Sequence, residues 1–176
     1  MNTWVALLRG INVGGNNILP MKDLRALLEA QGFEDVKTYI QSGNMVFRSG
    51  SDDAELLAKQ IENAIEQDFG FRPPVLLLSN EELGAAVSAN PYPEGDPKTV
   101  QFCFLFEPAP GTDMDALHDL SIPSEEFALT DAVFYLHAPD GIGRSKLVAK
   151  MAQDIPSEMT VRNLRTVLKL QEMAQG

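Results

Sequence analysis

One short segment near the N-terminus concentrates residue types that bind polar ligands. It begins with Arg9 and Gly10, passes through Gly14 and Gly15, and reaches Lys22 in the first turn of an expected helix. Glycines let the main chain approach a ligand closely, and main-chain amides together with basic side chains are donors for an anion. The segment therefore predicts a site for a small anionic ligand. Its further candidate donors are Asn12 and Asn16.

A second polar cluster lies on an expected hairpin with strands at Val36–Ile40 and Asn44–Arg48. Strand alternation places Tyr39 and Gln41 on one face, from which they reach a ligand held by the first segment. Gly43 also suits a tight turn in which no ligand takes part, so both interpretations stay open. The candidate ligand-binding residues of this hairpin are Tyr39, Gln41, Ser42 and Asn44.

Three expected helix starts near the chain ends carry cations, although the partial positive charge of a helix N-terminus favours acidic residues there. They are Lys22, Arg144-Ser145-Lys146 and Thr160–Asn163. A shared anion site explains this pattern, and so do unrelated surface cations that pair with nearby acids. Under the first interpretation we expect all these groups to converge in one cleft. The candidates added here are Arg144, Ser145, Lys146, Arg162 and Asn163.

Charge is distributed unevenly along the chain, whose net charge is −11. Residues 51–139 carry 17 acidic and 3 basic side chains, whereas residues 1–50 and 140–176 together carry 8 acidic and 11 basic ones. An acidic protein does not suit general binding to a nucleic-acid backbone, and a neutral-to-positive patch suits a small anion better than a long polyanion. Solubility alone explains the acidic middle equally well.

Other reactive groups are few. Cys103 is the single cysteine and lies in an alternating apolar strand, so it is expected in the core and forms no disulfide within the chain. His118 and His137 stand far apart without the spacing of metal ligands. For His137 near Asp140, a solvated strand-end histidine is expected before a general base. The sequence identifies neither a catalytic residue, nor a metal, nor a cofactor.

The chain begins without a basic start typical of a leader peptide, and no apolar run approaches the length of a membrane span. These features predict a cytoplasmic protein with no membrane partner. Composition indicates no oligomeric state.

The first half must position the glycine-rich segment. Residues 1–79 read as β-α-β-β-α-β, the order of a ferredoxin-like split βαβ unit. Glycines followed by phenylalanine end both helices, and a capping box of Asp52 and Glu55 begins the second. Besides the hairpin, the expected elements are the strand Trp4–Arg9, a helix from Pro20 to Gly32, a helix ending at Gly70 and the strand Val75–Leu78.

The second half echoes this order. Residues 80–99 predict a short helix, begun by a capping box of Ser79 and Glu82, and a proline-rich linker. Residues 100–176 predict β-α-β-β followed by helices at Ser145–Gln153 and Val161–Met173. The expected fold is α+β, with two ferredoxin-like halves of which the second lacks its last strand and ends in helices. The other expected elements are Val100–Phe106, Thr112–Leu120, Glu126–Leu129 and Ala132–His137.

Four segments resemble those of a mostly bacterial family known as domain of unknown function 1697. They are Leu7–Asn17, Thr38–Asn44, Gly143–Leu147 and Arg162–Val167. The resemblance implies an α+β fold of two ferredoxin-like halves and brings no reaction, cofactor or catalytic residue. Where relatives commonly have tryptophan after Arg-Asn, this chain has Leu164.

Three function classes remain from the sequence. The first is binding of a small anionic molecule, phosphate-bearing or nucleotide-like. The second is a protein or RNA interaction module without catalysis, for which Tyr39 and Phe47 are the nearby aromatic candidates in the first half. The third is a hydrolase or transferase whose catalytic carboxylate does not stand out from the solvated ones.

Overall fold

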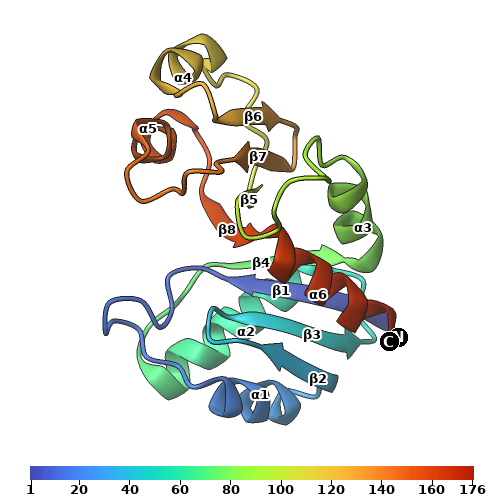
Figure 1. Ribbon diagram of the computed structural model, residues 1–176. Coiled ribbons are helices and arrows are strands. Elements are labelled where there is room, and N and C mark those ends of the chain that lie inside the picture. The colour runs from blue at the N-terminus through green and yellow to red at the C-terminus, as the bar shows by residue number, and fades with distance from the viewer. The chain divides into compact units, whose positions relative to one another are not determined.

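The computed structural model describes residues 1–176 and divides the chain into two compact units. Unit 1 comprises Met1–Ala85 and Lys169–Gly176, and unit 2 comprises Ala86–Leu168. The chain passes from one unit to the other within α3 (Asn80–Ser88) and again between residues 168 and 169, inside α6 (Leu164–Gln175). Figure 1 labels the helices and strands of both units.

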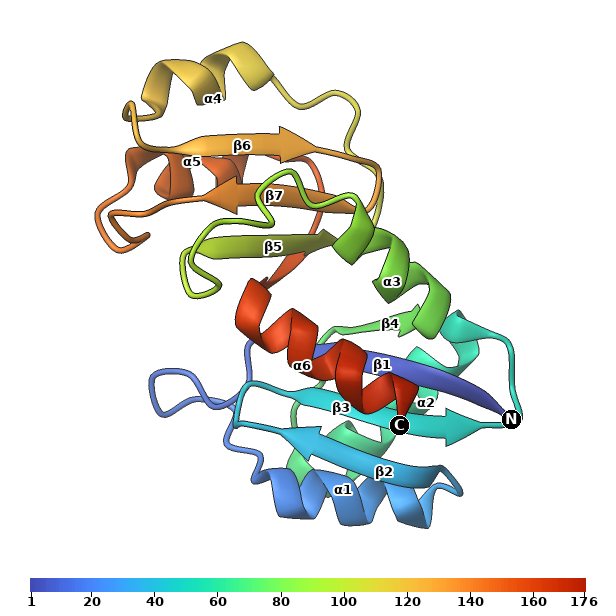
Figure 2. The ribbon, with the colours of Figure 1, turned by 45° about the vertical axis from the view of Figure 1, so that its right-hand side comes forward.

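Unit 1 contains a four-stranded antiparallel sheet in the order β2-β3-β1-β4. The central strand β1 pairs with β3 on one side and β4 on the other, as a ferredoxin-like βαββαβ unit requires. Two helices, α1 and α2, cover one face of this sheet (Figure 2). The elements are β1 (Asn2–Leu8), α1 (Met21–Ala30), β2 (Glu34–Tyr39), β3 (Asn44–Ser49), α2 (Ala54–Phe69) and β4 (Val75–Ser79).

Unit 2 repeats the arrangement, with a four-stranded antiparallel sheet in the order β6-β7-β5-β8. Leu117 of α4 and Leu147 of α5 pack with Cys103 and Phe134 of the sheet in one apolar core. The elements are β5 (Val100–Leu105), α4 (Met114–Leu120), β6 (Glu126–Leu129), β7 (Val133–His137), α5 (Lys146–Asp154) and β8 (Met159–Asn163).

The prediction that the second half lacks its last strand is wrong. Residues Met159–Asn163, part of which the sequence assigned to a helix, form β8 and pair with β5. The strand was missed because its polarity is inverted: Thr160 and Arg162 are buried, whereas Val161 between them is exposed. Buried and exposed side chains alternate along β8 as they do in any strand, but the buried side chains are polar and the exposed one is apolar.

Apart from the start of the last helix, the helix signals agree with the structure except at one cap. Gly32 and Gly70 have positive φ, and the Phe33 amide donates to the carbonyl of Leu28 as in a Schellman end. The expected capping box of α3 is formed, since the Ser79 and Glu82 side chains each accept from the other residue's amide. The cap of α2 is Asp53 instead of Asp52, because the Asp53 carboxylate accepts from the Leu56 amide.

No helix of the structure is both long enough and apolar enough to cross a membrane.

Candidate functional site

The glycine-rich segment folds into a miniature hairpin that projects from the end of β1. The main-chain N–H of Asn16 donates to the main-chain carbonyl of Val13 at 3.0 Å. The main-chain N–H of Asn12 donates to the main-chain carbonyl of Asn17 at 3.1 Å. Gly14 and Gly15 form the tip, both with positive φ, which is the pattern of a type I′ turn. Side chains on these two glycines would meet no crowding from the rest of the chain, and both are exposed. The tip therefore presents main chain to solvent.

Asn12 holds this hairpin in place with all the hydrogen-bonding groups of its side-chain amide. Its Nδ2 donates to the Leu19 carbonyl at 2.8 Å and to the Gln41 carbonyl at 2.9 Å, and its Oδ1 accepts from the Leu19 amide at 2.7 Å. Leu19 directly precedes Pro20, which begins α1. Asn12 thus connects the hairpin, the approach to α1 and the β2–β3 turn through three hydrogen bonds within the protein.

The two polar clusters of unit 1 therefore lie side by side. The Leu8 amide donates to the Gly43 carbonyl at 2.9 Å. A side chain at Gly43 would place its Cβ 2.7 Å from the Leu8 Cβ and 2.9 Å from the Ile11 Cδ1, so glycine is required here by close approach as well as by its φ of 82°. The buried Asn44 closes the turn, with its Nδ2 donating to the Tyr39 carbonyl at 3.2 Å.

Strand alternation does not place Tyr39 and Gln41 as expected. β2 ends at Tyr39, and Ile40 has a φ of 49°, which interrupts the pleat before Gln41. A β-branched residue in this conformation is an outlier. The turn leaves Gln41 and Ser42 exposed and Tyr39 half-buried.

The start of α1 differs from every other helix start in the chain. Pro20 is its N-cap, and no side chain accepts a hydrogen bond from the first-turn amides. The other five helices each have such a cap, supplied by Asp53, Ser79, Asp113, Ser145 and Asn163. Lys22 in this first turn is exposed and forms no ion pair, and Arg9 at the end of β1 is also exposed. In this first turn the main-chain amides of Asp23 and Leu24 donate to the Pro20 carbonyl, whereas those of Met21 and Lys22 have no acceptor within the chain. The turn carries one basic and one acidic side chain, Lys22 and Asp23.

Ser145 caps α5 in unit 2. Its Oγ accepts from the Val148 amide at 3.2 Å and donates to Glu125 Oε2 at 2.5 Å. Glu125 is 8% exposed and also accepts from the Ile122 amide at 3.0 Å. Arg144 and Lys146 flank this cap and line a cavity of about 490 Å³. The serine hydroxyl has a carboxylate acceptor but is committed to the helix cap.

Arg162 and Asn163 do not lie in the first turn of a helix. Arg162 is 8% exposed within β8, with its guanidinium donating to Thr160 Oγ1 at 2.8 Å and to the Val161 carbonyl at 2.9 Å. Burial lowers the pKa of Arg162 to about 10. Asn163 is the cap of α6, where its Oδ1 accepts from the Thr166 amide at 2.9 Å.

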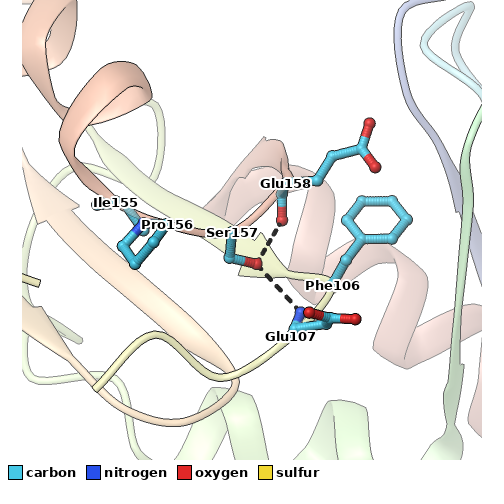
Figure 3. A pocket seen from close by; sticks show the side chains of 6 residues that line it. All are labelled: Phe106, Glu107, Ile155, Pro156, Ser157 and Glu158. Atoms are coloured by element: carbon cyan, nitrogen blue, oxygen red, sulfur yellow. Dashed lines mark hydrogen bonds between the residues drawn. The ribbon is translucent and has the colours of Figure 1, made fainter. Parts of the chain in front are cut away.

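A further hollow, of about 600 Å³, lies in unit 2 beside the ends of β5 and β8 (Figure 3). The Ser157 Oγ accepts from the Glu107 amide at 3.1 Å and donates to the Glu158 carbonyl at 3.0 Å. The ionisable residues that line this hollow are Glu107 and Glu158.

The remaining reactive groups are the single cysteine and the histidines. Cys103 is fully buried, and burial raises the pKa of its thiol to about 12, which suppresses the reactive thiolate. His137 stacks on Tyr92 with ring centroids 5.7 Å apart. No group of three or more His, Cys, Asp or Glu residues is arranged to hold a metal ion.

The structure thus sorts the candidate residues into two groups, one in each unit. That they form one cleft stays a prediction. Sequence reasoning missed Asp119, Glu125 and Asp140, which line the cavity with Arg144 and Lys146. No pattern in the sequence distinguishes these three acids from solvated ones. The group in unit 1 is Arg9, Gly10, Asn12, Gly14, Gly15, Asn16, Lys22, Tyr39, Gln41, Ser42 and Asn44, and the group in unit 2 is Arg144, Ser145, Lys146, Arg162 and Asn163.

Comparisons place the chain among known proteins. The family described as protein of unknown function (DUF1697) matches residues 1–135, so the chain belongs to this family, and the resemblance drawn from its motifs is confirmed. The solved structure of the conserved bacterial protein SP0830 from Streptococcus pneumoniae is similar to it, with a TM-score of 0.75, 27% sequence identity and 98% of each chain covered. No curated protein matches the sequence.

Proposed function

We propose that this member of the DUF1697 family binds a small phosphate-bearing or nucleotide-like anion at the start of α1 in unit 1. The observation that carries the proposal is the uncapped first turn of α1, which contains an unpaired Lys22. The main-chain amides of Met21 and Lys22, which have no acceptor within the chain, and the helix dipole together attract an anion, and a phosphate oxygen accepts hydrogen bonds in the place of the missing cap.

The surrounding residues divide into those that touch the ligand and those that hold the site. Arg9 and Lys22 supply positive charge, and the amides of Gly14 and Gly15 with the exposed side chain of Asn16 supply donors. Gly10 provides the positive φ at which the chain leaves β1. Gln41, Ser42 and Tyr39 approach from the β2–β3 turn, which Asn12 attaches to the start of α1. Asn12 and Asn44 are positioning residues because their amides bond to main chain.

Thermal unfolding with inorganic phosphate, nucleotides and sugar phosphates tests this proposal. A ligand at a hundred times its Kd stabilises the protein by about 2.7 kcal/mol, which raises Tm by about 5–10 °C for a chain of this size. Lys22→Ala removes a charge-assisted hydrogen bond worth about 1.5–3 kcal/mol, so Kd is expected to rise about 10- to 100-fold.

Lys37→Ala is the matched control, because Lys37 is an exposed lysine of β2 in the same unit and also forms no ion pair. This variant changes the net charge equally and should bind as the parent does. Equal weakening by both variants would mean that net charge and not a site attracts the anion. Flat curves for every compound would refute the proposal.

The predicted contribution of unit 2 has its own test in the same panel. If Arg144, Lys146, Arg162, Ser145 and Asn163 act on the same anion, Lys146→Ala weakens phosphate binding as Lys22→Ala does. Unchanged binding in Lys146→Ala would confine the anion site to unit 1.

A protein-docking role for the same end of unit 1 is the second candidate. Val13, Ile18 and Ile40 are 66%, 58% and 48% exposed, and the Asn12 contact to Gln41 joins the loops that carry them. Exposed aliphatic side chains on adjacent loops favour a protein partner over RNA. Phe47 cannot stack on RNA bases, because it is fully buried against Phe33. Binding of a partner protein that is abolished in Val13→Ser and unchanged in Lys22→Ala would favour docking.

A further inference from the structure

The cavity beside α4 and the start of α5 carries both signs of charge. Asp119, Asp140 and Glu125 lie in its wall together with Arg144 and Lys146. Neither cation forms an ion pair with these carboxylates, and Asp119 has no hydrogen-bond partner. Opposite charges thus face one space without neutralising one another.

Two of the three carboxylates in the wall already accept hydrogen bonds from within the protein. Asp140 accepts from Ser124 Oγ at 2.5 Å, and Glu125 accepts from Ser145 Oγ at 2.5 Å and from a main-chain amide. Asp119, Arg144 and Lys146 are therefore the groups free to pair with a bound molecule. Three acids against two bases make the wall net negative, and a phosphate with two negative charges would face repulsion there.

The wall also has an apolar part, formed by Leu120 and Ile122. Ile122 is 48% exposed, and the cavity of about 490 Å³ is of the size that takes small molecules. A ligand that satisfies all three features carries an ammonium group, a carboxylate and an apolar body.

We propose that this cavity of unit 2 binds an α-amino acid with an apolar side chain as a zwitterion. The ammonium group pairs with Asp119, the carboxylate pairs with Lys146 and Arg144, and the side chain packs on Leu120 and Ile122. The cavity is separate from the anion site proposed in unit 1 and does not depend on it.

Isothermal titration of the full chain with L-leucine tests the proposal against compounds that lack one charge each. The probes are L-leucine, 4-methylpentanoate, which lacks the ammonium group, and 3-methylbutylamine, which lacks the carboxylate. We expect one leucine per chain and at least tenfold weaker binding of each analogue. Glycine, which lacks the apolar side chain, should also bind at least tenfold more weakly.

Two surface variants locate the binding. Lys146→Ala and Asp119→Asn each remove one of the charged contacts and should weaken leucine binding at least tenfold. Lys150→Ala is the control, because Lys150 lies on the same helix and pairs with Asp154 outside the cavity. All three residues are at or near the surface, and circular dichroism verifies that each variant is folded.

Three outcomes overturn the proposal: no heat with any of the twenty amino acids at millimolar concentration, equal affinity for leucine and its singly charged analogues, or binding that Lys146→Ala leaves unchanged. Phosphate binding that Lys146→Ala alone abolishes would also overturn it, because it would assign the cavity to an anion. Phosphate binding lost in Lys22→Ala bears only on unit 1.

Discussion

Replacing Gly43 with alanine should destabilise unit 1 more than the same change at any other loop glycine of this unit. Gly43 lies in the β2–β3 turn with a φ of 82°, and its added Cβ would stand 2.7 Å from the Leu8 Cβ and 2.9 Å from the Ile11 Cδ1. The Leu8 atom is the first atom of a buried side chain on a central strand, so it cannot rotate away. The turn must shift instead, which lengthens the hydrogen bond that the Leu8 amide donates to the Gly43 carbonyl.

The magnitude has two parts. A left-handed conformation costs an alanine about 1–2 kcal/mol, partly offset because alanine also reduces the entropy of the unfolded chain. Overpacking in a buried site adds about 1–3 kcal/mol. We therefore expect the free energy of unfolding to fall by about 2–4 kcal/mol in Gly43→Ala.

Gly10→Ala separates these parts. Gly10 has a similar φ of 72°, but a Cβ there meets nothing within 4 Å. The free energy of unfolding should fall by only about 1 kcal/mol in this variant, from backbone strain alone. A difference of about 2 kcal/mol between the variants corresponds to about 4–8 °C in Tm for a chain of this length.

Urea and thermal unfolding of both variants, followed by circular dichroism, measure this difference. Equal loss of stability in the two variants would refute the reasoning. It would mean that position 43 requires glycine only because of its φ, and that a Cβ there does not clash with the end of β1. A Gly43→Ala protein as stable as the parent would refute the close packing of Gly43 against Leu8 and Ile11.

Three further changes test other parts of the structure. Asn12→Asp replaces two donated hydrogen bonds to carbonyls by repulsion and should lower the free energy of unfolding by about 2 kcal/mol in urea denaturation, whereas Asn17→Asp loses one exposed bond and should change it by less than about 1 kcal/mol. Asp53→Ala removes the N-cap of α2 and should lower the free energy of unfolding by about 1 kcal/mol, while Asp52→Ala should leave Tm nearly unchanged. A larger loss of stability in Asp52→Ala than in Asp53→Ala would mean that Asp52 is the N-cap. Burial raises the pKa of Cys103 from 9.0 to about 12, so its contribution to stability is complete below pH 9 and is lost as the pH rises towards 12. The alkaline loss of stability should therefore be steeper in the parent than in Cys103→Ala, and at pH 8 a thiol reagent should label Cys103 only as fast as the protein unfolds.

The glycines that end α1 and α2 could be read from the sequence because their signal is local. A helix end needs a left-handed residue within one turn of its last carbonyl, and Gly32 and Gly70 supply it wherever the helix lies. The capping box of Ser79 and Glu82 is equally local.

The strand β8 could not be read in this way. Its buried positions carry Thr160 and Arg162, and the Arg162 guanidinium donates to Thr160 Oγ1 within β8 itself. Hydropathy predicts burial from apolar side chains, so a strand whose apolar Val161 faces outward gives no strand signal. A cationic helix start was inferred from the same residues, and this was wrong for Arg162.

The sequence by itself predicted a polar loop at Gly14 and Gly15 before a helix. It also predicted that side chains beside the Gly43 turn reach a ligand held by this loop. The adjacency of the loop and the turn was decided by tertiary structure, through Asn12, whose amide bonds across 29 residues to the Gln41 carbonyl. Composition likewise placed many acids in the middle of the chain, but only folding brought Asp119 and Asp140 to the cavity that Lys146 lines. Turns and caps are encoded within a few residues of where they act, whereas a binding site depends on distances between segments, which the chain acquires only when its sheets form.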